Sequence, residues 1–240
     1  MTRSTFVNAL FTVAAAVPLG AGAATQSTQI AGIAVPDTQL ARDAAALAKS
    51  AEPIEIFNHS LRTYLFAELI AQAKKIDHDR EIVYVASILH DTGLTAQYMS
   101  ASFPFEVDGA NVARDLLHKH GVSEARSNLA WDAIALHDNG GIAQHKQPEV
   151  VLVNSGVGAD FGAYLDSISR SDVIAVLEGA PRTNFIDVFL NAAAVVAQKK
   201  PYASAHSFVA DVGYCKVPGF KLPSFCDGIH DDPFADFKRP

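Results

Sequence analysis

The sequence of 240 residues predicts an all-α fold, and three observations support that prediction. Apolar residues recur at intervals of three and four along most of the chain, as they do on the buried face of a helix. No run of alternating apolar and polar residues bounded by turns predicts a sheet. Pro53, Gly121 and Pro148 stand at the edges of the periodic segments, where they end or begin helices.

The periodic segments follow one another with loops of ordinary length. Asp37 or Thr38 can cap the first helix, and Ser204 or Ser207 can start a last short turn. Asn139-Gly140-Gly141 is expected to form a turn, and Gly156 and Gly158 are expected to loosen the helix that carries them. The predicted helices cover about residues 40–48, 56–75, 81–91, 106–120, 124–136, 148–160, 169–177 and 184–198.

The composition narrows the range of partners. The chain is 49% hydrophobic, which argues against disorder, and its formal net charge is −7. Lys74-Lys75 and Lys199-Lys200 are isolated doublets, so no basic cluster is available to bind nucleic acid or an anionic membrane surface. We therefore expect a small-molecule substrate and no nucleic-acid partner. The oligomeric state is left open, with a homo-oligomer as one option.

The N-terminus has the features of a signal peptide spanning residues 1–23. Arg3 supplies a positive charge, residues 11–20 form a short apolar run, and Ala21-Gly22-Ala23 fits a cleavage site. The run is too short to be a transmembrane helix, and no other segment is long enough. The mature chain is therefore expected to be exported to a periplasm or the exterior, without membrane contact once the signal is removed.

Two cysteines, Cys215 and Cys226, lie in a segment rich in proline and glycine near the C-terminus. In an oxidising compartment we expect them to form a disulfide, although two free thiols are the alternative. Closing so short a loop would stabilise the fold by about 3 kcal/mol. We expect residues 211–240 to form a coil tail closed by this bridge.

The apolar segment that ends on His90-Asp91 is the best candidate for a functional site. A histidine and an aspartate at the end of an apolar run are costly to bury alone, and a metal ion binds both groups. Gly93 is expected to cap the helix and leave the pair at a helix end. A buried histidine beside a capping aspartate is the simpler explanation of an isolated pair. A metal site is therefore favoured only if other segments of the chain supply further ligands.

The rest of the chain supplies further ligand types in helices whose apolar faces would share one core. His59, His90-Asp91 and Asp160 form a set of two histidines and two carboxylates spread over three helices. Such a set suits one divalent metal ion, with zinc as our first choice and iron or manganese as alternatives. It also leaves coordination positions for water or substrate.

Five sequence motifs carry a family resemblance. They are, in chain order, FNHSLRTY (57–64), ILHDTGL (88–94), FEVDGANVARDLLHKHG (105–121), WDAIALHDNGGIAQHKQPEVVLV (131–153) and GADFGAY (158–164). Together they resemble the HD-domain superfamily of metal-dependent hydrolases, in the branch that includes cyanamide hydratase. The resemblance covers about residues 57–208 and implies a single HD-domain helical bundle at residues 54–210, after an N-terminal arm and helix at residues 24–53.

The resemblance places His59, His90, Asp91 and Asp160 on the metal ligands. His137 and Asp138 are the candidate catalytic acid or base, because histidine titrates near neutrality. An acid at position 138, where the nearest relatives are expected to carry threonine, would repel anionic substrates and raise the pKa of a neighbouring histidine. The candidate substrate-binding residues are Glu106, Asn58 and Arg62. His118 or His120 could supply a second metal, although two residues apart on a helix at most one points inward.

These observations predict a metal-dependent hydrolase or hydratase that uses metal-activated water on a small neutral substrate resembling cyanamide or a nitrile. One alternative is a phosphohydrolase acting on a small phosphate ester, for which Arg62 and Arg182 are the only attractive phosphate-binding groups. The other alternative is a non-catalytic exported binding module whose metal is structural or absent.

Overall fold

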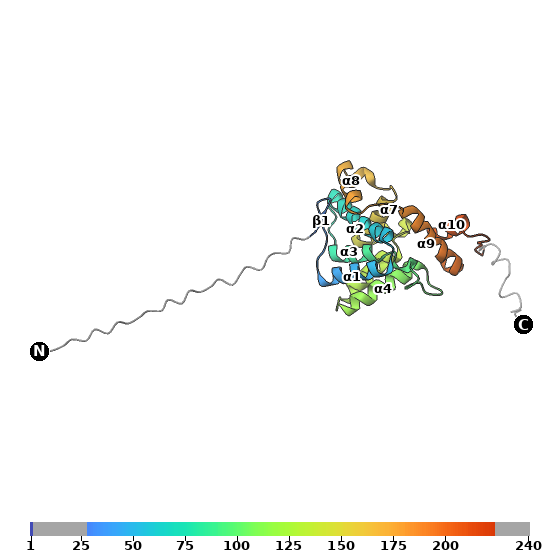
Figure 1. Ribbon diagram of the computed structural model, residues 1–240, viewed down its shortest axis with the longest axis horizontal. Helices are drawn as coiled ribbons and strands as arrows, with labels where there is room; N and C mark the ends of the chain where they lie inside the picture. The colour runs from blue at the N-terminus through green and yellow to red at the C-terminus, as the bar shows by residue number, and fades with distance from the viewer. Residues whose placement is uncertain (2–27, 224–240) are drawn as a thin grey trace, which may run out of the picture.

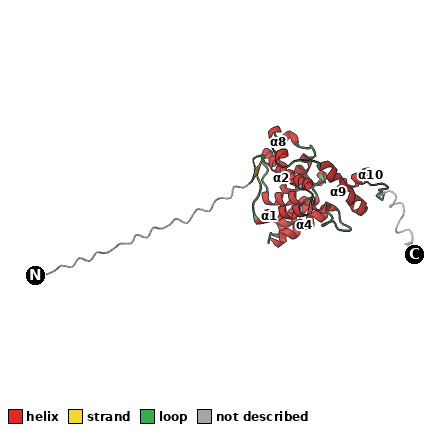
Figure 2. Cartoon of the chain, viewed as in Figure 1, coloured by secondary structure: helices red, strands yellow, loops and turns green. Residues whose placement is uncertain are grey.

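The computed structural model describes Met1 and residues 28–223, and helices dominate that part of the chain (Figures 1 and 2), which confirms the all-α prediction. No helix in residues 28–223 has the length and apolar character needed to cross a membrane. The α-helices are α1 (Gln39–Ala51), α2 (Ile54–Lys74), α3 (Arg80–Leu89), α4 (Phe105–Lys119), α5 (Glu124–Ala135), α6 (Gly140–Ala143), α7 (Pro148–Asp160), α8 (Arg170–Gly179), α9 (Phe185–Lys199) and α10 (Phe208–Lys216). Short 3₁₀ turns are η1 (Thr92–Leu94), η2 (Leu165–Ser167) and η3 (Pro201–Ser204).

Helix α2 lies at the centre of the bundle. Its apolar residues point in all directions, and Tyr64, Leu65 and Phe66 are buried. A helix that is apolar all round must be covered on every side, and α2 contacts α1, α3, α7, α8 and α9. Figure 1 shows α8 on one side of α2, α1, α3 and α4 on the other, and α9 and α10 at the end of the molecule nearer the C-terminus.

The helix ends follow the capping signals in the sequence. Of the two candidate caps of α1, Thr38 accepts a hydrogen bond from the backbone N–H of Ala41. Gly121 adopts a left-handed φ of 68° after α4, as a glycine that ends a helix does. Pro148 occupies the first turn of α7, where its missing N–H costs nothing. Ser207 caps α10 through its side chain.

Two segments outside the predicted helices are regular in the structure. Strands β1 (Gln29–Ile30) and β2 (Ile33–Ala34) form an antiparallel hairpin within the N-terminal arm, where no strand was predicted. Ala31 and Gly32, with φ values of 52° and 74°, supply its two-residue turn. The predicted turn at residues 139–141 instead begins α6 at Gly140. Segments this short leave little periodicity from which to predict them.

The predicted coil tail begins later than residue 211, because α10 continues to Lys216. Cys215 is therefore exposed near the end of a helix and not in coil. Cys226, the predicted signal peptide and the rest of the tail lie outside the described residues. The disulfide and the export signal stay predictions.

Gly156 determines how closely α7 approaches α2. A Cβ atom built at Gly156 would overlap the carbonyl oxygen of Thr63 and lie 3.1 Å from the Cβ of Ala67. The sequence predicts that this glycine loosens its helix, but α7 is continuous to Asp160. The missing side chain instead permits the backbone contact between the two helices.

We predict that Gly156→Ala lowers the free energy of unfolding by about 1–3 kcal/mol, because the added methyl group forces α7 away from α2. Gly141→Ala is the matched control, since a Cβ there meets no atom closer than 3.6 Å and alanine favours a helix. Urea unfolding followed by circular dichroism measures both. Equal stability of the two variants would contradict the packing role of Gly156.

Candidate metal centre

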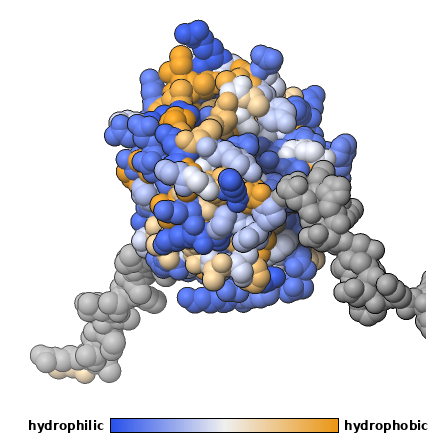
Figure 3. Space-filling model, turned by 90° about the vertical axis from the view of Figure 1, so that its right-hand side faces the viewer, coloured by the Kyte–Doolittle hydropathy of each residue, from blue (hydrophilic) through white to orange (hydrophobic). Residues whose placement is uncertain are grey.

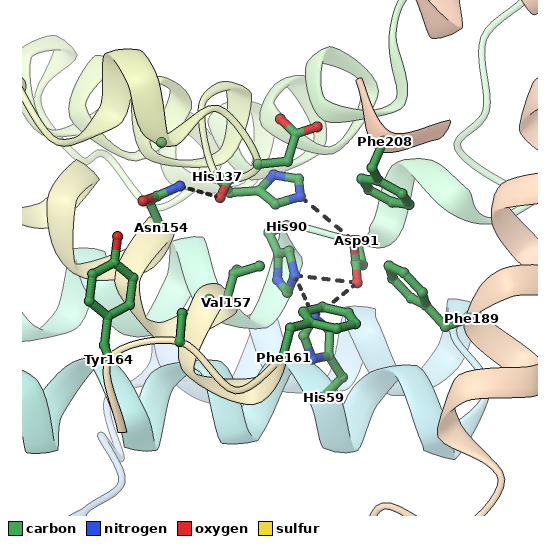
Figure 4. Close-up of a pocket in the computed structure, with 14 residues that line it drawn as sticks. His59, His90, Asp91, His137, Asn154, Val157, Phe161, Tyr164, Phe189 and Phe208 are labelled. Carbon is green, nitrogen blue, oxygen red and sulfur yellow. Dashed lines mark hydrogen bonds and ion pairs between the residues drawn. The ribbon is translucent and has the colours of Figure 1, made fainter. Parts of the chain in front are cut away.

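Three buried side chains from two helices bring ligand atoms together at one point (Figure 4). The Nε2 atoms of His59 and His90 lie 3.2 Å apart. Asp91 Oδ2 lies 3.6 Å from His59 Nε2 and 3.3 Å from His90 Nε2. His59 comes from α2, and the other two residues follow α3 directly. This is the one group of metal-ligand type found among the described residues.

The end of α3 allows the two adjacent residues to converge. His90 keeps helical backbone angles, with φ −61° and ψ −32°, whereas Asp91 departs from them with φ −98° and ψ 1°. Adjacent residues inside a helix point about 100° apart, so the departure brings the carboxylate to the same side as the imidazole. Gly93 does not act as the predicted C-cap, because it lies in η1 without a left-handed φ. Its missing side chain instead admits the carbonyl oxygen of Phe105.

The outer ring nitrogens of both histidines are held by acceptors. His59 Nδ1 lies 2.6 Å from Asp160 Oδ2, and His90 Nδ1 lies 2.7 Å from the carbonyl oxygen of Ser87. A carboxylate and a carbonyl only accept hydrogen bonds, so each Nδ1 donates its proton. In the neutral rings the Nε2 lone pairs therefore face the cluster, which is the arrangement of metal-ligating histidines.

The Asp91 carboxylate is the reason for inferring a cation. The residue is 1% exposed, and neither of its oxygens has a hydrogen-bond partner. Burial alone would raise the pKa of Asp91, but the facing rings of His90 and His59 outweigh burial and lower it to about 2. The carboxylate raises the pKa of His90 against the effect of burial. A buried anion facing two imidazoles fits a divalent metal ion, whose binding would displace the proton that the raised pKa holds on the His90 ring.

Asp160, predicted as the fourth ligand, does not join this group. Its Oδ2 faces His59 Nδ1, and Arg62 donates from Nε to Oδ1 at 2.7 Å and from Nη2 to Oδ2 at 2.8 Å. Arg182 Nη1 is 2.8 Å from the same Oδ1. Burial would raise the pKa of Asp160, but His59 and Arg62 lower it strongly. The structure thus places Asp160 behind His59, where it orients the ring.

His137 lies beside the cluster, with its Nε2 3.9 Å from Asp91 Oδ1. Its Nδ1 is 2.7 Å from the carbonyl oxygen of Ile134, which leaves Nε2 as an acceptor. Burial, followed by the nearby His90, lowers the pKa of His137, although Asp138 was expected to raise it. Asp138 has the expected direction of effect, but burial outweighs it. Asn154 donates to the His137 carbonyl at 2.8 Å and holds this loop (Figure 4).

The three predicted substrate-binding residues do not line the pocket at the cluster. Asn58 donates to the Pro181 carbonyl, and Arg62 is buried against Asp160. Glu106 is 4% exposed at the start of α4, and burial together with Asp138 raises its pKa to about 8. Glu106 therefore lies behind the pocket, beside Asp138, which does line it.

A second metal finds no support at the histidines proposed for it. His118 Nε2 lies 3.0 Å from Glu124 Oε2, and His120 Nε2 lies 3.0 Å from Asp43 Oδ2. These pairs sit on α4 and its neighbours, away from the cluster at residues 59, 90 and 91.

The ligand atoms open into a pocket of about 370 Å³. Its walls come from the ends of α2, α3 and α5 and from α7, α9 and α10. The sequence predicts the histidines and acids of this pocket but not Asn154 or the apolar walls. Val157 and Phe189 lie on predicted helices, whereas residues 161–164 lie in the last HD-like motif without a predicted role. The apolar lining residues are Val157, Phe161, Ala163, Tyr164, Phe189 and Phe208.

The chain belongs to the HD domain family, which matches residues 56–175. This span contains His59, the His90-Asp91 pair and Asp160, so the family assignment and the metal-ligand geometry agree. Two yeast proteins are similar over most of the chain: cyanamide hydratases DDI2 and DDI3 of Saccharomyces cerevisiae are each 26% identical over 181 residues, which cover 73% of this chain and 80% of the relative. An uncharacterized protein of Clostridium beijerinckii is 28% identical over 83 residues, or 33% of this chain and 52% of that protein.

We predict that Asp91→Asn and Asp160→Asn differ in metal binding. The first removes a charged ligand, so the purified variant should retain no stoichiometric divalent metal. The second removes only the group that orients His59, so affinity should fall about 10- to 100-fold. Metal analysis and metal titration of variants whose circular dichroism shows a native fold measure this. Equal, complete loss in both would instead make Asp160 a ligand.

We also predict that Glu106 makes stability depend on pH. The unfolded side chain loses its proton near pH 4.5, whereas the folded one retains it to about pH 8. The folded state therefore binds more protons in this window, and the unfolding free energy should fall by about 1 kcal/mol per pH unit as the pH rises. Glu106→Gln should flatten this slope, and the exposed control Glu178→Gln should not. An unchanged slope in Glu106→Gln would contradict the assignment.

Proposed function

We propose that this protein is a metal-dependent hydratase that adds water to the C≡N bond of a small neutral cyanamide or nitrile. The observation that carries the proposal is a three-ligand cluster whose open side faces a pocket that, within residues 28–223, is lined by neither lysine nor arginine. The similarity to yeast cyanamide hydratases supports the same reaction. Three protein ligands leave a position for water, as a catalytic site requires and a closed structural site does not.

We propose zinc as the metal. Ligand atoms about 2.1 Å from a tetrahedral zinc ion lie about 3.4 Å from one another. The three distances within the cluster are 3.2, 3.3 and 3.6 Å. Two histidines and one carboxylate also suit iron, whose octahedral ligands would lie about 3.0 Å apart. When bound, such an ion lowers the pKa of a water molecule and makes it a nucleophile near neutral pH.

His137 and Asp138 are the remaining groups of the site that can take part in the proton transfers of the reaction. Addition of water forms a C–O bond, breaks one C–N π bond and moves one proton from water to nitrogen, which gives an isourea. Transfer of the remaining hydroxyl proton to the same nitrogen breaks the second C–N π bond and forms the carbonyl, so cyanamide becomes urea. His137 Nε2 is an unprotonated acceptor beside Asp91 and can take up the proton and return it to the nitrogen. Asp138 lines the same pocket and disfavours anionic substrates.

Phosphate-ester hydrolysis is less well supported because both candidate arginines are engaged elsewhere. Arg62 is 0% exposed and bonds Asp160 and the carbonyls of Ala180 and Pro181. Arg182 bonds Asp160 on the same side of His59. A phosphate in the pocket would meet Asp138 without a cationic side chain to stabilise it.

We predict that the metal-loaded protein converts cyanamide to urea and that His137→Gln lowers kcat at least about 100-fold without loss of metal. His145→Gln is the control, because this histidine is exposed in the segment between α6 and α7. Urea formation and bound metal are measured on the same samples. Full turnover by His137→Gln, or by chelated protein, would contradict the mechanism. Phosphate release from nucleotides or sugar phosphates, without reaction on nitriles, would favour the phosphohydrolase.

A further inference from the structure

The pocket is larger than the simplest substrate of the proposed reaction requires. Its volume is about 370 Å³, and a water molecule occupies about 30 Å³ in the liquid, so roughly a dozen water-sized groups fit. Cyanamide has three non-hydrogen atoms. Most of the pocket would therefore remain filled with water when cyanamide alone is bound.

One wall of the pocket is a continuous aromatic surface. Phe189 of α9 and Phe208 of α10 stack with centroids 5.3 Å apart and planes inclined by 18°, and Phe161 lies 5.5 Å from Phe189. Figure 4 shows these three rings beside Asp91 and His59. They come from three separate elements, so their convergence on the pocket reflects the tertiary fold.

The polar groups of the pocket are concentrated near the metal ligands. His137 and Asp138 lie there, and the Asn154 amide is already engaged, donating to His137 and accepting from Gln144. The phenylalanine wall offers no polar side-chain atom. A substituent extending from the reacting group along this wall therefore meets aromatic carbon.

Two aromatic side chains of the pocket are open to solvent. Phe161 is 49% exposed and Tyr164 is 39% exposed, and both line the pocket. Figure 3, which views the side of α9 and α10, shows hydrophobic groups gathered on one part of this face among hydrophilic ones. An apolar group bound against Phe161 would remove this surface from water, which is favourable.

We propose that the substrate is a nitrile or cyanamide carrying an apolar substituent of about the size of an aromatic ring. This inference rests on the proposed function and specifies its substrate class. The C≡N group lies at the histidine–aspartate cluster and the ring lies on the phenylalanine wall. The substituent carries no negative charge, because neither lysine nor arginine of the described residues lines the pocket and Asp138 opposes an anion.

The test compares cyanamide with phenylcyanamide and benzonitrile on the metal-loaded protein. Burial of a ring against the wall should raise kcat/KM for the better of the two aromatic substrates about 10- to 100-fold over cyanamide. Phe161→Ala should remove most of this preference, lowering kcat/KM for the better aromatic substrate at least about 10-fold more than it lowers kcat/KM for cyanamide. Phe103→Ala is the matched control, since Phe103 is 51% exposed and does not line the pocket.

A binding measurement separates this inference from the proposed function. Phenylurea and urea, the expected products, are titrated calorimetrically into the metal-loaded protein, which requires no turnover. Tighter binding of phenylurea that Phe161→Ala abolishes supports the apolar subsite even if no nitrile reacts, in which case only the proposed function fails. Cyanamide turnover with equal, weak binding of both ureas and no preference for aromatic substrates overturns the inference and leaves the hydratase intact.

Discussion

The arrangement of the helices around the site depends on a buried negative charge. Asp91 is almost fully buried, and neither oxygen accepts a hydrogen bond. An isolated carboxylate in such a place is strongly unfavourable, so the surroundings must supply positive charge. The rings of His59, His90 and His137 supply one shared proton at most, since burial lowers the pKa of two of them. A divalent cation satisfies the carboxylate and both ligand rings together.

A second buried charge orients one of the two imidazole rings that face the first. Asp160 receives hydrogen bonds from His59, Arg62 and Arg182, and Arg62 is itself completely buried. This network links α2, α7 and the segment before α9, so it determines which way the His59 ring faces. Charge-assisted bonds of this kind are strong. The Asp160 carboxylate already accepts from these three side chains, so it lies behind His59 and outside the group of residues that could hold a metal ion.

The sequence predicts the helices and the ligand pair well because both depend on local signals. Periodicity and caps locate α1 to α5 and α7 to α9, and Ser207 is one of two residues predicted to start a short last turn where α10 begins. The chemistry of His90-Asp91 can be predicted from one apolar segment. The hairpin, α6 and the end of α10 are too short to show a period. The position of Asp160 could not be predicted, because it depends on which partner a carboxylate meets after folding. The phenylalanine wall could not be predicted, because an aromatic residue on an apolar helix face is equally typical of a buried core and of a pocket lining.

The phenylalanine wall and the histidine–aspartate cluster are two parts of one site, of which the first is apolar and the second is charged. The cluster needs low exposure, because burial keeps the His59 and His137 rings neutral and strengthens each electrostatic contact. Two phenylalanines of the wall also contribute to this burial, because Phe161 and Phe189 are ring neighbours of His59. His59 also stacks on Phe185 at 4.8 Å. Excluding water from the ligands and binding an apolar substituent thus require the same side chains. A substrate carrying such a substituent would complete the burial that the half-exposed Phe161 leaves open.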